Sequence, residues 1–254
     1  MKPPLVMQAL SRPKVIWGLL SMLLSRGQPT CLQVEGLKLE QALGLGNGTW
    51  AALSGTAYEA ELSEALSLLE PGDNFVDLGA NIGAYSLRVA QKLGPGSRIV
   101  AVEPNPYLVR ALKRNLILNQ FDFVDVIEAA VGEQAGECDL QWRKSLLNAG
   151  SVAHSPRGGG THTARVARVN MDEELERLGV GKIRLIKMDI EGSEPQAVHG
   201  LRKTLLRDRP VILFENSHPE TRSLLMSLGY SVGKLRRGKL TATNRGQNLW
   251  AIDL

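Results

Sequence analysis

The chain has 254 residues, of which 43% are hydrophobic and 22% are charged, and its formal net charge is +4. These proportions are typical of a globular protein and exclude a disordered or collagen-like chain. The small positive excess does not require an anionic partner, and no nucleic acid is expected. A chain of this length suits one α/β domain with an extension.

The N-terminal fifth contains no segment long enough to span a membrane. Its longest apolar stretch, residues 15–24, is well short of the roughly 20 residues that cross a bilayer. We expect residues 1–54 to form an extension whose amphipathic helix packs on the domain or on a partner, with weak contact to a membrane surface as the alternative. The two cysteines, Cys31 and Cys138, are too few for a disulfide framework, which favours a reducing compartment and predicts a cytoplasmic location.

Residues 55–254 alternate strand-length apolar runs with longer helix-period segments, which is typical of a parallel sheet covered on both faces. Helices are predicted at residues 58–69, 85–93 and 107–119. Strands are predicted at residues 74–78, 98–102, 124–128, 183–188 and 211–214. The pattern weakens between residues 132 and 169, where residues 155–161 form either a mobile cover or a plain surface loop. The expected fold class is a doubly wound α/β domain.

The turn after the first predicted strand carries two glycines, Gly79 and Gly83, and a carboxylate, Asp77. Ligands of open parallel sheets bind at the carboxyl ends of strands, where glycine lets the backbone come close. A dinucleotide site would show three glycines in fixed spacing, and its pyrophosphate would be repelled by Asp77. A positively charged ligand such as S-adenosylmethionine fits this turn better.

Glu103 follows the second predicted strand, 20 residues beyond Gly83, at the position where nucleoside-binding folds place an acidic ribose reader. Its carboxylate can accept hydrogen bonds from both ribose hydroxyls, each contributing on the order of 1.5 to 3 kcal/mol. The alternative is that Glu103 and Asn105 only begin the next helix. Together the turn and Glu103 predict a nucleoside site.

The chain resembles the FkbM-type S-adenosylmethionine-dependent methyltransferases. The similar segments are Tyr58 with Glu59, residues 76–83, residues 102–106, residues 130–132, residues 187–194, and Phe214 with Glu215. The resemblance extends over about residues 55–252 and implies a methyltransferase domain at 55–254. It implies the Rossmann-like class I sheet of about seven strands, the last antiparallel, with residues 229–232 and 249–252 as the final pair.

The resemblance also implies transfer of a methyl group from S-adenosylmethionine to a hydroxyl oxygen of a sugar, a glycan or a natural product. The methionine portion would lie against the 77–83 turn, the ribose against Glu103, and the adenine edge against residues 128–130. The expected cofactor-binding residues are Asp77, Gly79, Ala80, Asn81, Gly83, Glu103, Pro104, Glu128, Ala130 and Asp189.

Three carboxylates, Asp189, Glu191 and Glu194, follow the predicted strand at residues 183–188. Neighbouring carboxylates repel one another and raise each other's pKa values, so a cation such as Lys187 is expected beside them. Glu191 and Glu194 could instead stabilise the first turn of a helix. Asp189, at the very end of the strand, should face the ligand.

The next strand ends in Glu215 and Asn216, with His218 close behind. Asp189, Glu215 and Asn216 would form an oxygen-ligand set suited to Mg²⁺, or the same groups would bind substrate hydroxyls. The catalytic candidates are Asp189, Glu215 and His218, because a neutral imidazole or a carboxylate can take the acceptor's proton. His218 could instead begin a helix.

Two other classes of function remain open in the sequence. One is a nucleotide-dependent oxidoreductase of the nicotinamide type, and the other is a noncatalytic module that only binds the cofactor. The basic residues near the C-terminus are a solvated loop face or a contact for phosphate or membrane. They are Lys234, Arg236, Arg237 and Lys239.

Overall fold

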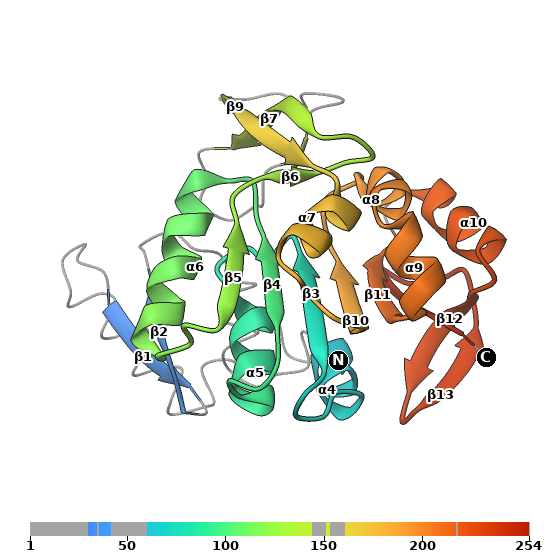
Figure 1. Cartoon of the computed structure of the whole chain (residues 1–254), viewed down its shortest axis with the longest axis horizontal. Helices are drawn as coiled ribbons and strands as arrows, with labels where there is room; N and C mark the ends of the chain where they lie inside the picture. The colour runs from blue at the N-terminus through green and yellow to red at the C-terminus, as the bar shows by residue number, and fades with distance from the viewer. Residues whose placement is uncertain are drawn as a thin grey trace, which may run out of the picture.

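The computed structural model describes residues 30–34, 36–41, 60–143, 151–152, 161–216 and 218–253 (Figure 1). The predicted N-terminal amphipathic helix and residues 155–160 of the predicted loop lie outside the described residues. The boundary at residue 54 therefore stays a prediction.

The centre of the molecule is an eight-stranded sheet in the order β13-β12-β14-β11-β10-β3-β4-β5. Its strands are β3 (Asn74–Leu78), β4 (Ile99–Val102), β5 (Val124–Ile127), β10 (Ile183–Met188), β11 (Val211–Glu215), β12 (Ser231–Arg236), β13 (Lys239–Ala242) and β14 (Asn248–Ile252). β14 runs antiparallel to β11 and β12, while β5, β4, β3, β10 and β11 are parallel. The predicted doubly wound α/β class is confirmed.

The sheet has one strand more than the sequence predicts. β13 is added at the edge as an antiparallel partner of β12. Arg237 and Gly238, which join the two strands, both have positive φ, the conformation of the tightest hairpin turns. The outer positions of this hairpin carry exposed Lys234, Arg236 and Lys239, so the predicted solvated basic face exists, and a contact with a membrane through it stays a prediction.

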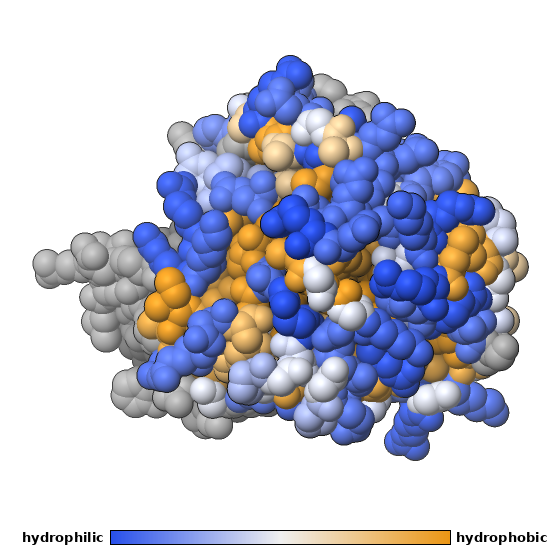
Figure 2. All heavy atoms as spheres, in the orientation of Figure 1, coloured by the Kyte–Doolittle hydropathy of each residue, from blue (hydrophilic) through white to orange (hydrophobic). Residues whose placement is uncertain are grey.

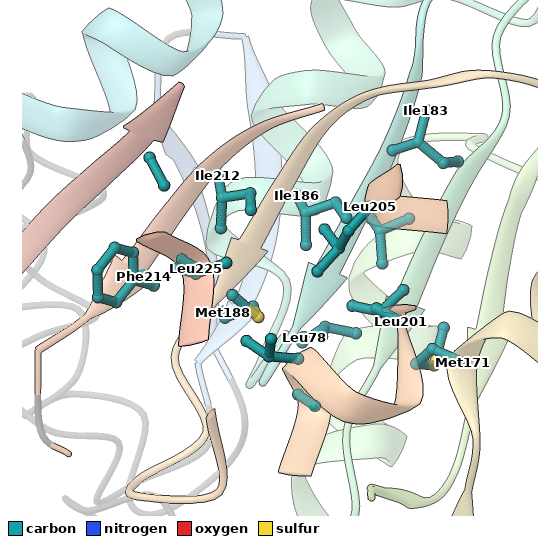
Figure 3. Close-up of a cluster of buried hydrophobic side chains, with 14 of the residues drawn as sticks. Leu78, Met171, Ile183, Ile186, Met188, Leu201, Leu205, Ile212, Phe214 and Leu225 are labelled. Atoms are coloured by element: carbon teal, nitrogen blue, oxygen red, sulfur yellow. The ribbon is translucent and has the colours of Figure 1, made fainter. Parts of the chain in front are cut away.

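Helices cover both faces of the sheet because successive strand residues point to opposite sides. Val76 and Leu78 of β3 belong to one buried cluster, with residues of α7 (Met171–Arg177), α8 (Glu194–Gly200), α9 (Arg202–Asp208) and α10 (Pro219–Ser227). Figure 3 shows part of this cluster. Phe75 belongs to the other cluster, with residues of α4 (Ala60–Ser67), α5 (Ala84–Leu93) and α6 (Pro106–Leu118). Each face of the sheet thus has its own core.

A second sheet of four strands, in the order β6-β9-β7-β8, lies beyond the carboxyl ends of β3, β4 and β5 (Figure 1). Its strands are β6 (Ala130–Val131), β7 (Gly136–Arg143), β8 (Ser151–Val152) and β9 (Thr161–Val169). It occupies the region where the sequence shows no clear pattern. Most of residues 132–169 that the structure describes are strand, and of the predicted loop only Thr161 is described, as the first residue of β9.

A two-stranded hairpin, β1 (Thr30–Val34) and β2 (Leu37–Gln41), packs beside the domain. Leu37 and Leu39 are buried in the core on the side of α4, α5 and α6. The Asn119 side chain accepts a hydrogen bond from Lys38 N at 2.8 Å and donates one to Lys38 O at 2.6 Å. This part of the N-terminal extension is therefore joined to α6.

The face of the molecule seen in Figure 2 is largely hydrophilic, with apolar surface between the polar side chains. Among the described residues, the large hydrophobic side chains that are exposed come from three helices: Tyr107 and Ile117 in α6, Leu206 in α9 and Met226 in α10. No helix that the structure describes is both long enough and apolar enough to cross a membrane. The predicted cytoplasmic location is untested.

The strand order reverses between β3 and β10. From β3 the chain moves to β4 and β5, and then crosses back to β10 and β11 on the other side of β3. Ligands of such sheets bind outside the carboxyl ends of the strands at this reversal. A ligand site is therefore expected among the segments that follow β3, β4, β10 and β11.

Candidate active site

The turn after β3 is pressed between β4 and β10. Gly79 N and Ala80 N both donate hydrogen bonds to Val102 O at 2.9 Å. Gly79 has φ 78°, and a Cβ atom added to it would lie 1.9 Å from Asp189 O. Gly83 has φ 95°, and an added Cβ would lie 2.6 Å from a methyl group of Leu112. Gly79 is required by the close approach of the backbone after β10, and Gly83 is favoured by its positive φ, whatever the turn binds.

Glu103 organises this turn from the end of β4. Its side chain is 4% exposed and accepts hydrogen bonds at 2.9 Å from Asn81 N and from Asn105 N. Burial raises the pKa of Glu103 to about 7, although the two backbone donors and the charge of Lys187 lower it. Each carboxylate oxygen keeps a lone pair for a further donor, which is what the predicted ribose contact requires.

Asn105 begins a helix, as the alternative interpretation of this segment stated. Its side chain accepts a hydrogen bond from Tyr107 N at 3.0 Å and caps α6. Pro104, between Glu103 and Asn105, is half-buried. The segment after β4 therefore combines a helix start at Asn105 with a buried carboxylate at Glu103.

The end of β5 lies next to Glu103, because Glu103 N donates a hydrogen bond to Ile127 O at 3.1 Å. Glu128 is exposed and lies 3.5 Å from Lys113 Nζ. Ala130 is 2% exposed. The structure thus places residues 128–130 beside the predicted ribose reader, and their contact with adenine stays a prediction.

Asp77 is fully buried at the end of β3, where the register of the sheet sets it opposite Lys187 of β10. Lys187 Nζ lies 3.3 Å from Asp77 Oδ1 and 3.7 Å from Asp189 Oδ2. Ser86 Oγ donates to Asp77 Oδ2 at 2.7 Å. The prediction of a lysine beside the carboxylates is confirmed. The Asp77 carboxylate is fully buried in the protein. Its predicted contact with the methionine portion stays a prediction.

The three carboxylates after β10 have different surroundings. The Asp189 side chain is 48% exposed and directly follows β10. Glu194 is fully buried in the first turn of α8, and its Oε1 accepts a hydrogen bond from Ile190 N at 3.1 Å, which favours the structural interpretation of this residue. The pKa of Glu191 is raised by burial and by repulsion from Asp189 and Glu194. Only Asp189 combines exposure with a place at the strand end.

Glu215 is the last residue of β11. Its Oε2 is buried and has no hydrogen-bond partner in the part of the chain that the structure describes. Burial, followed by repulsion from Asp189, Glu191 and Glu194, raises the pKa of Glu215 to about 7, against a hydrogen bond from Gln247 that lowers it. A carboxylate with a pKa near neutrality is suited to exchange a proton at physiological pH.

Comparison with known proteins decides what kind of site this is. The model of the methyltransferase FkbM domain matches residues 77–232, more than half of the chain. The chain belongs to the FkbM methyltransferase family. The FkbM-family match extends from Asp77 to the beginning of β12. It includes the turn after β3 (residues 79–83, here called the donor turn), Glu103, Asp189 and Glu215. The donor of this S-adenosylmethionine-dependent family is the cationic ligand that the turn after β3 suggests.

Several FkbM-type relatives are similar to the chain. Methyltransferase sdnD of Sordaria araneosa is 29% identical over 194 residues, which is 63% of this chain and 74% of that protein. The 31-O-demethyl-FK506 methyltransferase FkbM of Streptomyces tacrolimicus is 31% identical over 162 residues, 52% of this chain and 61% of that protein. The 2-O-methyltransferase NoeI of Sinorhizobium fredii is 27% identical over 160 residues, 58% of this chain and 65% of that protein. The chain therefore spans about three fifths to three quarters of these relatives.

One solved structure of the same family is that of methyltransferase FkbM from Methylobacillus flagellatus. It is 20% identical, with a TM-score of 0.49, and covers 72% of this chain and 44% of that one.

The magnesium site predicted for this FkbM-family chain is not supported. The Asn216 side-chain nitrogen donates to Gly246 O at 3.2 Å and to Asn244 O at 3.4 Å, so the amide is engaged by the loop before β14. Within the described ranges, no three His, Cys, Asp or Glu side chains lie close enough to hold a metal ion. The described residues therefore give no support to Asp189, Glu215 and Asn216 as a Mg²⁺ site.

His218 is the N-cap of α10, as the alternative interpretation of this residue stated. Its Nδ1 accepts a hydrogen bond from Glu220 N at 3.3 Å, and its side chain is 43% exposed. A neutral imidazole that accepts at Nδ1 carries its proton on Nε2, so it cannot take a proton there. The structure therefore argues against His218 as the general base.

No sequence motif indicates two residues that contact candidate site residues, Tyr85 and Gln247. Lys187 Nζ lies 5.2 Å from the Tyr85 ring centroid, and the Gln247 side chain bonds the Glu215 carboxylate. Gln247 directly precedes β14, which pairs with β11. Only that long-range strand pairing brings it to the site, and no local motif marks it.

Proposed function

We propose that the chain transfers a methyl group from S-adenosylmethionine to a hydroxyl oxygen of a sugar, a glycan or a natural product, with Glu215 as the general base. The observation that carries this proposal is the half-buried Glu215, whose pKa lies near 7 at the acceptor end of a family-typical donor site. Two relatives, a 31-O-demethyl-FK506 methyltransferase and a 2-O-methyltransferase, support oxygen as the acceptor atom.

The donor end of the site is the turn after β3 together with Glu103. S-adenosylmethionine supplies the activated methyl group when bound. Glu103 accepts hydrogen bonds from the ribose hydroxyls, and the hydrogen bonds from Asn81 N and Asn105 N hold its carboxylate in place for them. The acidic residues around this turn favour a cationic sulfonium over a neutral thioether.

The acceptor end is formed by Asp189 and Glu215. Two strand spacings separate β3 from β11, with β10 between them, which is about 10 Å and leaves room for the donor's methyl group and an acceptor hydroxyl in line. The exposed Asp189 carboxylate accepts a hydrogen bond from the acceptor and orients it.

The transfer forms one bond, breaks one bond and moves one proton. The acceptor oxygen forms its bond to the methyl carbon, the carbon–sulfur bond breaks with its electron pair remaining on sulfur, and the hydroxyl proton passes to Glu215. Proton removal of this kind contributes typically 10² to 10⁴-fold to a rate, most effectively when the base has a pKa near the operating pH.

A donor carrying a labelled methyl group tests the proposal, with a panel of sugars, glycolipids and small alcohols as acceptors. Label should appear on an acceptor oxygen with the wild-type protein. With Glu215→Gln the turnover should fall by about a hundredfold or more while donor affinity, measured by titration calorimetry, stays the same. Label transfer to nitrogen or carbon, or full turnover in Glu215→Gln, would contradict the proposal.

The alternative classes make different predictions in the same experiment. Membership of the FkbM family argues against a nicotinamide-dependent oxidoreductase. A noncatalytic module would bind the donor and transfer no label to any acceptor in the panel.

A further inference from the structure

Lys187 lies where the donor turn and the acceptor end of the site meet. It is paired directly with Asp77 in the register between β10 and β3, and it is 7% exposed. The strand order of the sheet reverses between these two strands, so a side chain here can reach both halves of the site.

On the donor side, Lys187 holds both the carboxylate and the backbone of the turn. Its Nζ donates a hydrogen bond to Gly79 O at 3.2 Å and lies 3.3 Å from Asp77 Oδ1. Asp77 Oδ1 is buried, and the described residues give it no hydrogen bond of good geometry, so the ammonium group is what neutralises it. The Tyr85 ring, with its centroid 5.2 Å away, provides a further favourable face for the cation.

On the acceptor side, the same ammonium group lies 3.7 Å from Asp189 Oδ2. Asp189 is half exposed at the end of β10, and a carboxylate in such a position would otherwise sample several rotamers. Two carboxylates share one cation, so the group carries a single negative charge, which complements the positive charge of a sulfonium donor.

We propose that Lys187 is a positioning residue for methyl transfer, which holds the donor turn at Gly79 and the acceptor-side carboxylate Asp189 in one fixed arrangement. The inference rests on the proposed function. Lys187 acts through these two groups, since its ammonium contacts Gly79 O and lies beside Asp189.

The test separates position from charge. Lys187→Met alone leaves Asp77 buried without a cation, and that variant can fail to fold. The informative protein is Asp77→Asn with Lys187→Met, which removes both buried charges and keeps the net charge of the group through Asp189. By titration calorimetry with S-adenosylmethionine, and separately with S-adenosylhomocysteine, we expect this double variant to bind at least about tenfold more weakly than the wild type.

Two single variants complete the test. Lys187→Arg keeps the charge and the donors and should bind within about threefold of the wild type. Asp77→Asn alone should lose less affinity than the double variant, because Lys187 still reaches Gly79 and Asp189. Wild-type affinity in the double variant, or equal losses in the double and single variants, would overturn the assignment.

A matched control is offered by Arg98, which forms an ion pair with Asp125 at 2.7 Å at the opposite end of the strands. Arg98→Met should lower the melting temperature without changing donor affinity. If the wild-type protein bound neither nucleoside, the proposed function itself would fall and this inference with it. If the wild type binds and only the Lys187 series behaves as the control does, the positioning role alone is wrong.

Discussion

The Glu103 carboxylate makes donor binding depend on pH in a calculable way. Burial raises the pKa of Glu103 to about 7, well above that of a free glutamate. Ribose hydroxyls donate hydrogen bonds to the ionised carboxylate and so bind that form. The competent fraction is about one tenth at one pH unit below the pKa and about nine tenths at one unit above it. Nucleoside affinity should therefore fall about tenfold, or about 1.4 kcal/mol, from pH 8 to pH 6.

The ligand for this measurement should have no titrating group of its own in that range. Methylthioadenosine retains the adenine and ribose and lacks the amino acid portion of the donor, so it isolates the ribose contact. Titration calorimetry at pH 6, 7 and 8 gives the affinity. At pH 7, buffers of different ionisation enthalpy should also reveal the release of about half a proton per ligand bound.

Two variants assign the effect to the residue. Glu103→Gln should bind weakly and equally at all three pH values, because it has no proton to lose. Glu215→Gln should retain the pH dependence, although the pKa of Glu215 is also raised to about 7, because Glu215 lies at the end of β11 and is not among the groups that shift the pKa of Glu103. An affinity that does not change between pH 6 and 8, or that rises as the pH falls, would refute the ribose role of Glu103.

Three further results are expected. Gly79→Ala should be destabilised by several kcal/mol in urea unfolding, because its Cβ would lie 1.9 Å from Asp189 O in a backbone with φ 78°. Glu215→Gln should melt about 2 to 4 °C above the wild type at pH 8 and level with it at pH 4. Because the folded-state pKa of Glu215 is raised, the wild-type protein loses stability as the pH rises from about 4.5 to 7, and the variant does not. The expected shift in melting temperature is small because Glu215 is only half-buried. EDTA should leave label transfer unchanged, because the described residues include no group of three His, Cys, Asp or Glu side chains that could hold a metal ion; a loss restored by Mg²⁺ would contradict this expectation.

The strands that carry the site could be predicted because both of their faces are buried. Residues 74–78 and 183–188 are mainly apolar, with Asp77, Arg184 and Lys187 as charged interruptions, and the structure has strands with those bounds. The second sheet could not be predicted in this way. β7 and β9 are exposed along much of their length, so little hydrophobic contrast marks them, and their pairing joins residues far apart in the chain.

The positions of the site residues could be predicted better than their contacts. Asp77, Glu103, Asp189 and Glu215 lie at or just after strand ends, as motif spacing indicates. What each one touches depends on neighbouring strands. Asp77 meets Lys187 through the β3–β10 register, and β14 brings a loop against the end of β11. Such long-range pairing is not encoded in any local motif.

The second sheet is inserted between the two halves of the catalytic domain. The chain enters the second sheet after β5 and returns through α7 to β10. The insertion therefore separates β3, β4 and β5 from β10 and β11. An insertion at that point can change in length and sequence without altering the order of the strands that carry Asp77, Glu103, Asp189 and Glu215. We expect differences in acceptor among related proteins to be concentrated in this second sheet.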